Sequence, residues 1–175
     1  MNIKSLVLCG LFSAVIAVTA WISVPFSVPF TMQTFGIFCA LLILGGKSGT
    51  ISIAVYILLG IAGLPVFAGF QGGIGVVFSP LGGYILGFIA MGAIYYLITE
   101  HFEGKRYIRA IGLSAGLIIC YFTGTVWYTI WCGTDFLTAL TVCVIPFVIP
   151  DAVKLSLAFA AAKKIEQANL LKKIT

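Results

Sequence analysis

The sequence predicts an all-α integral membrane protein with six transmembrane helices, built as one membrane-embedded domain over residues 1–175. Composition is the first reason, because 61% of the 175 residues are hydrophobic and only 9% are charged. A soluble domain is closer to half apolar and a quarter charged. The lengths and order of the apolar runs are the second reason, because they suit helices that span a membrane. A helix satisfies its own backbone hydrogen bonds and needs no partner from lipid.

The first predicted span covers residues 5–24, and Pro25 and Pro29 follow it, where proline prevents the helix from continuing. Two short apolar segments come next, 32–44 and 50–62, joined by the glycine-rich turn 45–49. At about 1.5 Å per residue, each covers roughly 20 Å of a hydrocarbon core of about 30 Å. We therefore expect the pair either to be extended by flanking residues or to enter the membrane as a hairpin.

A glycine-rich outer loop, residues 63–83, is predicted between the third and fourth helices. Its apolar composition favours a lid that packs over something, and its glycines permit the turns that a lid needs. The alternative is a flexible outer loop. The fourth helix is predicted over residues 84–99 and the fifth over 110–131, with a charged inner loop between them.

The last apolar block, residues 136–162, is too long for one span, at roughly 40 Å if it were continuous. Pro146 and Pro150 lie inside it. We expect a break near Pro150, where the last helix would begin with proline in its first turn. Residues 163–175 are predicted to form a polar cytoplasmic tail.

The basic residues orient the chain. With the N-terminus inside, the inner segments carry nine of the ten Lys and Arg residues, and the tenth is Lys154. The outer segments 22–33, 63–83 and 132–135 carry none. Because cytoplasmic loops of membrane proteins are enriched in Lys and Arg, both termini are predicted to be cytoplasmic. The net charge of +5 therefore reflects topology, and no nucleic-acid partner is expected.

Asp151 and Lys154 are charged residues within the last apolar block. Placing either charge at the centre of a bilayer costs about 2.5–3.5 kcal/mol on insertion scales. Their spacing of three residues puts both side chains on one helix face. We interpret the pair as a site for a polar solute, with one acceptor and one cationic donor. The alternative is an ion pair that only locks the last helix to a neighbour.

Other polar and aromatic residues near the predicted helix ends are candidate ligand contacts: Gln33 in the break after the first span, Phe67 and Gln71 in the glycine-rich loop, and Tyr84 after Gly82 and Gly83. For Trp21, Trp127, Tyr128 and Trp131, an interfacial aromatic belt is the preferred interpretation. Small residues form two stripes on the first helix, Gly10 with Ala14 and Ser13 with Ala17. Such stripes allow close helix packing, either within the bundle or against a partner.

Several classes of site are not expected. The five cysteines are scattered without a Cys-x-x-Cys pair, so neither a metal nor a disulfide is predicted. The single histidine, His101, lies in the charged inner loop. No nucleotide-binding pattern and no recognisable catalytic motif occurs, so the chain is expected to be neither an enzyme nor an ATPase, and no cofactor is expected.

Four runs carry a family resemblance: 29–34 (PFTMQT), 56–68 (YILLGIAGLPVFA), 80–88 (PLGGYILGF) and 149–154 (IPDAVK). In this order they resemble the BioY family, the biotin-binding S components of energy-coupling factor (ECF) transporters. The resemblance covers nearly the whole chain and adds Ser79 to the candidate ligand contacts. It departs from the family at Ser79 and Leu81, where members often have glycine and threonine.

The resemblance implies a vitamin importer of a prokaryotic cytoplasmic membrane, in which this chain captures biotin from outside. A membrane coupling subunit and two cytoplasmic ATPase subunits are the implied partners, and the Gly10/Ala14 and Ser13/Ala17 stripes are the implied docking face. Asp151 would accept from a ureido N–H, and Lys154 would meet either the carboxylate or the ureido oxygen. Two alternatives remain: a stand-alone ion-coupled secondary transporter that uses Asp151 as an ion site, and an S component for another vitamin.

Overall fold

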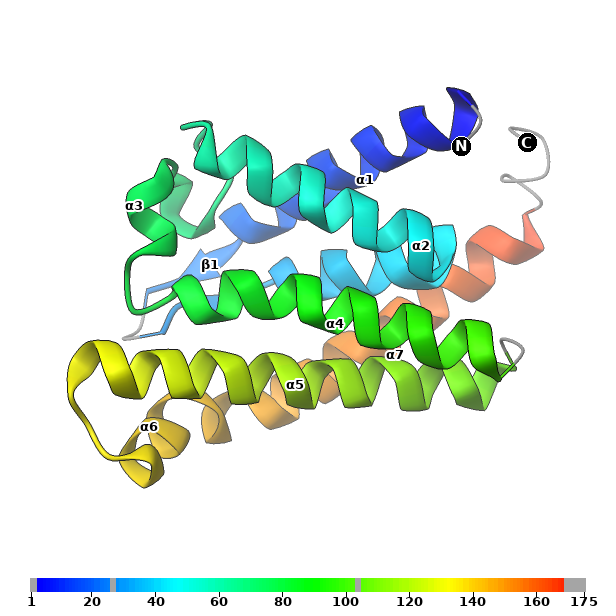
Figure 1. Cartoon of the computed structure of the whole chain (residues 1–175). Helices are drawn as coiled ribbons and strands as arrows, with labels where there is room; N and C mark the ends of the chain where they lie inside the picture. The colour runs from blue at the N-terminus through cyan, green and yellow to red at the C-terminus, as the bar shows by residue number, and fades with distance from the viewer. Residues whose placement is uncertain (1–2, 26–27, 103–104, 169–175) are drawn as a thin grey trace.

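The computed structural model describes residues 3–25, 28–102 and 105–168 and shows a bundle of helices with a short β-hairpin (Figure 1). Among these residues, five helices are long and apolar enough to cross a membrane: α1 (Ile3–Trp21), α2 (Gln33–Ile61), α4 (Gly82–His101), α5 (Arg106–Cys132) and α7 (Ile145–Gln167). Shorter elements connect them: β1 (Ser23–Val24), β2 (Phe30–Thr31), the 3-10 helix η1 (Ala68–Phe70), α3 (Ile74–Val77) and α6 (Phe136–Cys143).

Helix α2 is folded back on itself at Gly45. This residue has φ 81° and ψ 170°, a conformation that glycine adopts at no steric cost. The side-chain nitrogen of Gln33 donates to the hydroxyl of Tyr56 over 2.9 Å, whereas a straight helix would hold residues so far apart in sequence at roughly 35 Å. The two halves therefore lie antiparallel, and they correspond to the short segments expected over 32–44 and 50–62.

The bundle core lies around α2. Helix α1 packs along α2, α4 packs along α5, and α2 also contacts α4 and α7. Large apolar side chains from α1, α2 and α4 fill the centre and are almost fully buried, among them Ile16, Phe38 and Met91. Gly116 brings α5 close to α4, because a Cβ there would lie 2.8 Å from Cγ of Met91. This packing holds the helix ends that form the pocket described below.

The break in the last apolar block lies at Val144, so the expectation of a break near Pro150 is wrong. Val144 has φ −124° and ψ −54° and separates α6 from α7. Pro146 lies in the first turn of α7, where its missing N–H would have had no helical partner. Pro150 is inside the helix and removes only the bond to the carbonyl of residue 146. Helix α7 includes residues 163–167 of the expected tail, whereas residues 169–175 lie outside the described residues.

The two ends of the bundle differ in character. Helix α1 begins and α7 ends at one end, and the β-hairpin, α3 and α6 lie at the other (Figure 1). At this second end, the chain between α2 and α4 folds back over α2, because the N–H of Gly73 donates to the carbonyl of Gly60 over 2.7 Å. A single bridge between Phe67 and Gln71 closes a small loop within it. The segment 64–81 thus covers one end of the bundle. It lies within the loop expected over residues 63–83, and from here on the name outer loop refers to residues 64–81.

Candidate functional site

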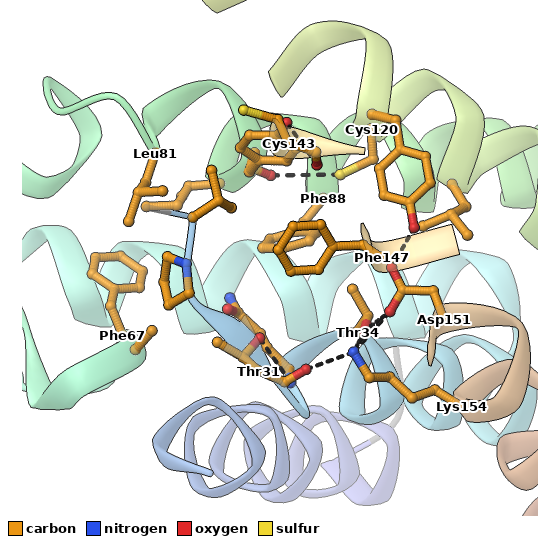
Figure 2. A pocket seen from close by; sticks show the side chains of 18 of the residues that line it. Thr31, Thr34, Phe67, Leu81, Phe88, Cys120, Cys143, Phe147, Asp151 and Lys154 are labelled. Atoms are coloured by element: carbon orange, nitrogen blue, oxygen red, sulfur yellow. Dashed lines mark hydrogen bonds and ion pairs between the residues drawn. The ribbon is translucent and has the colours of Figure 1, made fainter. Parts of the chain in front are cut away.

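A pocket lies beneath the outer loop. Its walls come from the β-hairpin, the first turn of α2, the outer loop, α4, α5, the end of α6 and the start of α7. Figure 2 shows Asp151 and Lys154 at one end of the pocket, with Phe67 and Leu81 at the other. The rings of Phe88 and Phe147 lie between these ends. The pocket therefore has one polar end and a long apolar remainder.

Asp151 and Lys154 form a buried ion pair at the polar end. The ammonium nitrogen lies 2.8 Å from Oδ1 of Asp151, and the two residues are only 2% and 4% exposed. They are neighbours because α7 runs unbroken through both residues and their spacing places them on one face. Burying either charge without a partner would be costly, and as a pair the charges of Asp151 and Lys154 cancel.

Lys154 donates to three acceptors. Besides Asp151, these are the backbone carbonyl of Thr31 at 2.7 Å and the hydroxyl of Thr34 at 3.1 Å. The ammonium nitrogen also lies 4.3 Å from the ring centroid of Phe30, within the range of a cation–π contact. Because an ammonium group has three protons, all of its donors are used within the protein.

Asp151 accepts from three donors but retains acceptor capacity. Oδ1 accepts from Lys154 and from the hydroxyl of Thr34 at 2.9 Å. Oδ2 accepts from the hydroxyl of Tyr121 at 2.5 Å. A carboxylate can accept about four hydrogen bonds, so Oδ2 has room for one more donor from the pocket. Of the two charged groups, Asp151 is therefore the one that can bind a further partner without losing an existing one.

Three residues of this polar network were absent from the sequence predictions: Thr31, Thr34 and Tyr121. Thr31 and Thr34 lie in the run 29–34 beside Gln33, so the family resemblance was a signal for them. Thr31 acts through its backbone carbonyl, which carries no side-chain signal. Tyr121 is one of several aromatic residues in α5, and its partner Asp151 is thirty positions away in the sequence. Nothing local in the sequence distinguishes it.

The apolar end of the pocket depends on two glycine contacts. Tyr84 lies with its ring against Gly124, where any side chain would collide with it, and its hydroxyl donates to the carbonyl of Cys143 over 3.3 Å. Phe67 lies against Gly60 in the same way, and its ring forms a T-shaped pair with that of Tyr56, with 5.6 Å between centroids. Both rings are thus fixed by their surroundings and line the pocket.

Of the seven ligand contacts predicted from sequence, six line this pocket: Asp151, Lys154, Tyr84, Gln33, Phe67 and Gln71. Gln33 donates to Tyr56, whose hydroxyl donates in turn to the carbonyl of Val66 over 3.2 Å, so it links α2 to the outer loop. Ser79 does not line the pocket. Its hydroxyl donates to the carbonyl of Val76 over 2.6 Å and accepts from the N–H of Leu81, within the turn that precedes α4.

The two small-residue stripes of α1 lie on different faces. Ser13 and Ala17 are buried, and the hydroxyl of Ser13 donates to the carbonyl of Ser52 in α2 over 2.8 Å. Gly10 and Ala14 are exposed. A Cβ added at Gly10 would meet nothing within 4 Å. The absence of a side chain at this position is therefore not required by the packing of the described residues.

Comparisons with known proteins agree with each other. A model of the BioY family matches residues 1–170. "Biotin transporter BioY" of Thermotoga maritima is 41% identical over 165 residues, which is 94% of this chain and 96% of that protein. "Probable biotin transporter BioY" of Pyrococcus horikoshii is 39% identical over 168 residues, or 95% and 98%. The crystal structure of the S-component for biotin from an ECF-type ABC transporter superposes with a TM-score of 0.85 at 25% identity, covering 94% of this chain and 92% of that one.

Proposed function

The chain belongs to the BioY family, and from this premise we propose that it is the biotin-binding S component of an ECF transporter. It captures biotin from outside the cell and delivers it inward with an ATPase-driven partner module. It is a binding subunit rather than an enzyme. The observation that carries this proposal is the buried Asp151–Lys154 pair in the wall of an otherwise apolar pocket.

The charge of the pair favours the ureido end of biotin as its partner. Asp151 and Lys154 together are neutral, so a neutral ureido group leaves the site neutral. The valerate carboxylate would instead leave a net negative charge at membrane depth, which is costly. In our proposal a ureido N–H donates to the free acceptor position of Asp151 Oδ2. Lys154, whose protons already have acceptors, attracts the ureido oxygen mainly through its charge.

The rest of biotin then lies along the apolar walls. In this proposal its bicyclic thioether ring packs on Phe147 and Tyr84, which line the pocket. Its aliphatic tail points toward Phe67, which lies at the end of the pocket opposite Asp151 and Lys154 (Figure 2). Among the residues that the structure describes, Lys154 is the sole Lys or Arg lining the pocket. The carboxylate therefore has no cation of its own at the far end. The exposed amide of Gln71 is the polar group that lies there.

We also propose a topology of six spans, with the two halves of α2 counted separately and with the start of α1 and the end of α7 in the cytoplasm. The pocket end then faces outward, since the outer segments carry no basic residue and nine of the ten Lys and Arg residues lie inside. The five apolar helices and the transporter relatives support a multi-pass protein of a prokaryotic cytoplasmic membrane.

The partners in this proposal are a membrane coupling subunit and two cytoplasmic ATPase subunits. The docking face on α1 is reduced to Gly10 and Ala14, because Ser13 and Ala17 are occupied by packing against the bundle. Exposed small residues on a spanning helix allow a second helix to approach closely. The free space around Gly10 is what a partner helix would fill.

The test is binding of labelled biotin to the purified wild-type protein in detergent, with thiamine and riboflavin as controls. We expect saturable binding of one biotin per chain and none of the other two vitamins. Binding of another vitamin in place of biotin would overturn the assigned substrate. Ion-coupled uptake by the chain alone, with no ATPase subunits copurifying, would instead favour the stand-alone transporter.

A further inference from the structure

The three tryptophans of the chain all donate to the outer loop. The indole N–H of Trp21, at the end of α1, donates to the carbonyl of Pro65 over 2.8 Å. On α5, Trp127 donates to the carbonyl of Ser79 over 2.8 Å, and Trp131, one turn later, donates to that of Phe78 over 2.9 Å. Interfacial tryptophans commonly direct this N–H toward the wet side of the membrane boundary. Here each one is used by loop backbone instead.

These hydrogen bonds hold both ends of the outer loop. Trp21 holds the first part against α1, where its ring also stacks on Phe70 with centroids 5.1 Å apart. Trp127 and Trp131 hold the last residues before α4 against α5. Between the two anchored ends, Gly69 and Gly73 adopt positive φ angles of 67° and 95°. The middle of the loop thus contains the backbone positions that turn most easily.

Side-chain packing attaches only part of the loop to the bundle. Its large apolar residues Phe70, Ile74 and Phe78 are 62%, 59% and 63% exposed. Phe67 and Val77 are buried, with the ring of Phe67 against Gly60, and Val66 and Val76 pack partly against the core. A segment with many exposed side chains opens more easily than the core, so the three indole bonds add to the hydrogen bonds from Gly73 to Gly60 and from Tyr56 to Val66 in keeping this one closed.

We propose that Trp21, Trp127 and Trp131 are positioning residues that hold the outer loop over the bound ligand and so set its rate of release. None of the three lines the pocket, but the loop they hold contributes Phe67, Gln71 and Leu81 to its walls. They act on the ligand only through this loop. The proposal rests on the proposed function, because the ligand whose release is measured is biotin.

The first variant to test is Trp131→Phe. Trp131 is 54% exposed, so phenylalanine keeps an aromatic ring there, creates no core cavity and removes the N–H donor. Trp21→Phe tests the other end of the loop. Tyr107→Phe is the matched control, because Tyr107 is an exposed aromatic residue at the opposite end of α5. Dissociation of labelled biotin is followed after addition of excess unlabelled biotin.

We expect each tryptophan variant to release biotin roughly two to ten times faster than wild type, the range that one lost hydrogen bond supports. The number of binding sites and the association rate should stay at wild-type values. Tyr107→Phe should behave as wild type. Wild-type dissociation rates in both Trp131→Phe and Trp21→Phe would overturn the proposal and leave biotin capture intact. Loss of binding sites without faster release would also overturn it, because that result indicates damage to the fold.

A second measurement needs no ligand. Amide hydrogen exchange in the ligand-free protein should be faster in residues 64–81 of the tryptophan variants and unchanged in α1, α2 and α4. Exchange that rises throughout the bundle, or that stays unchanged in the loop, would overturn the proposal that the tryptophans hold the outer loop. If the wild-type protein binds no biotin, the proposed function fails, whereas this measurement still decides whether the tryptophans hold the loop.

Discussion

Tyr121 and Asp151 connect α5 to α7 at the wall of the pocket, with the phenol donating to Oδ2 of the carboxylate. At the other end of the same two helices, Arg109 pairs with Glu166 at 2.8 Å. An apolar groove lies between α5, α6 and α7, and Tyr121 lines both this groove and the pocket. Tyr121 therefore orients Asp151 and separates the polar end of the pocket from this groove.

Removing the Tyr121 hydroxyl should weaken biotin binding. Tyr121→Phe keeps the ring between pocket and groove but deletes a hydrogen bond to a charged acceptor, an interaction that contributes about 1.5–3 kcal/mol. Since Oδ2 is then free to turn, we expect the Kd for biotin to rise roughly tenfold or more. Equilibrium binding in detergent measures it. Tyr128→Phe, which does not line the pocket, is the control, and an unchanged Kd in Tyr121→Phe would contradict the assigned role.

Thr34 should be required for the stability of the folded protein, in addition to any contact that it makes with the ligand. Its hydroxyl accepts from Lys154 and donates to Asp151, so it completes the hydrogen bonding of both charges. Thr34→Val has nearly the same shape and leaves both groups short of a partner, which we expect to destabilise the protein by about 1–3 kcal/mol. Thermal unfolding in detergent should show a lower midpoint for Thr34→Val and a nearly unchanged one for Thr34→Ser. Equal midpoints for valine and serine would contradict this account.

The orientation of biotin predicts which analogues compete. If the neutral ureido group meets the Asp151–Lys154 pair, the tail carboxylate is not paired with a buried cation. Biotin methyl ester should then displace labelled biotin with an affinity within about tenfold of biotin itself. An analogue methylated on a ureido nitrogen should compete at least a hundredfold less well, because it loses a donor to Asp151. The reverse order of affinities would place the carboxylate at Lys154.

The exposed face of α1 should be needed for assembly and not for binding. Gly10→Trp and Ala14→Trp each add a bulky side chain to this face. At Gly10, an added Cβ would have no described atom of this chain within 4 Å. We expect both variants to bind biotin as wild type does and to lose copurification with the coupling and ATPase subunits. Ile118→Trp places the same side chain on an exposed part of α5 and should still assemble. If instead Ile118→Trp fails to assemble and Gly10→Trp assembles as wild type does, the docking face lies on α5.

Sequence alone could find the features whose signal is local. Asp151 and Lys154 stand out because charges in an apolar run are rare, and Gly45 lies in a glycine-rich turn between two short apolar segments. The start of α7 could not be placed, because Pro146 and Pro150 are both compatible with a first turn. The choice between them depends on the break at Val144, which has no distinctive residue type.

The remaining features depend on contacts between distant segments. Tyr121 meets Asp151 across thirty positions and Thr31 meets Lys154 across more than a hundred. Trp21, Trp127 and Trp131 lie near helix ends as an interfacial belt would, but their acceptors are backbone carbonyls of the outer loop. Every residue has such a carbonyl, so composition and spacing cannot identify which one an indole will meet.

The most direct measurement compares biotin binding by the wild-type protein and by the double variant Asp151→Asn/Lys154→Met. Removing one partner of a buried ion pair leaves an uncompensated charge that costs about 3–5 kcal/mol. In a single variant, a loss of binding could therefore result from a loss of folding. The double variant removes both charges and keeps similar side-chain volumes. We predict that it unfolds within a few degrees of wild type and binds biotin at least a thousandfold more weakly, about 4 kcal/mol. A Kd within tenfold of the wild-type value would contradict the assignment of the pair as the biotin site.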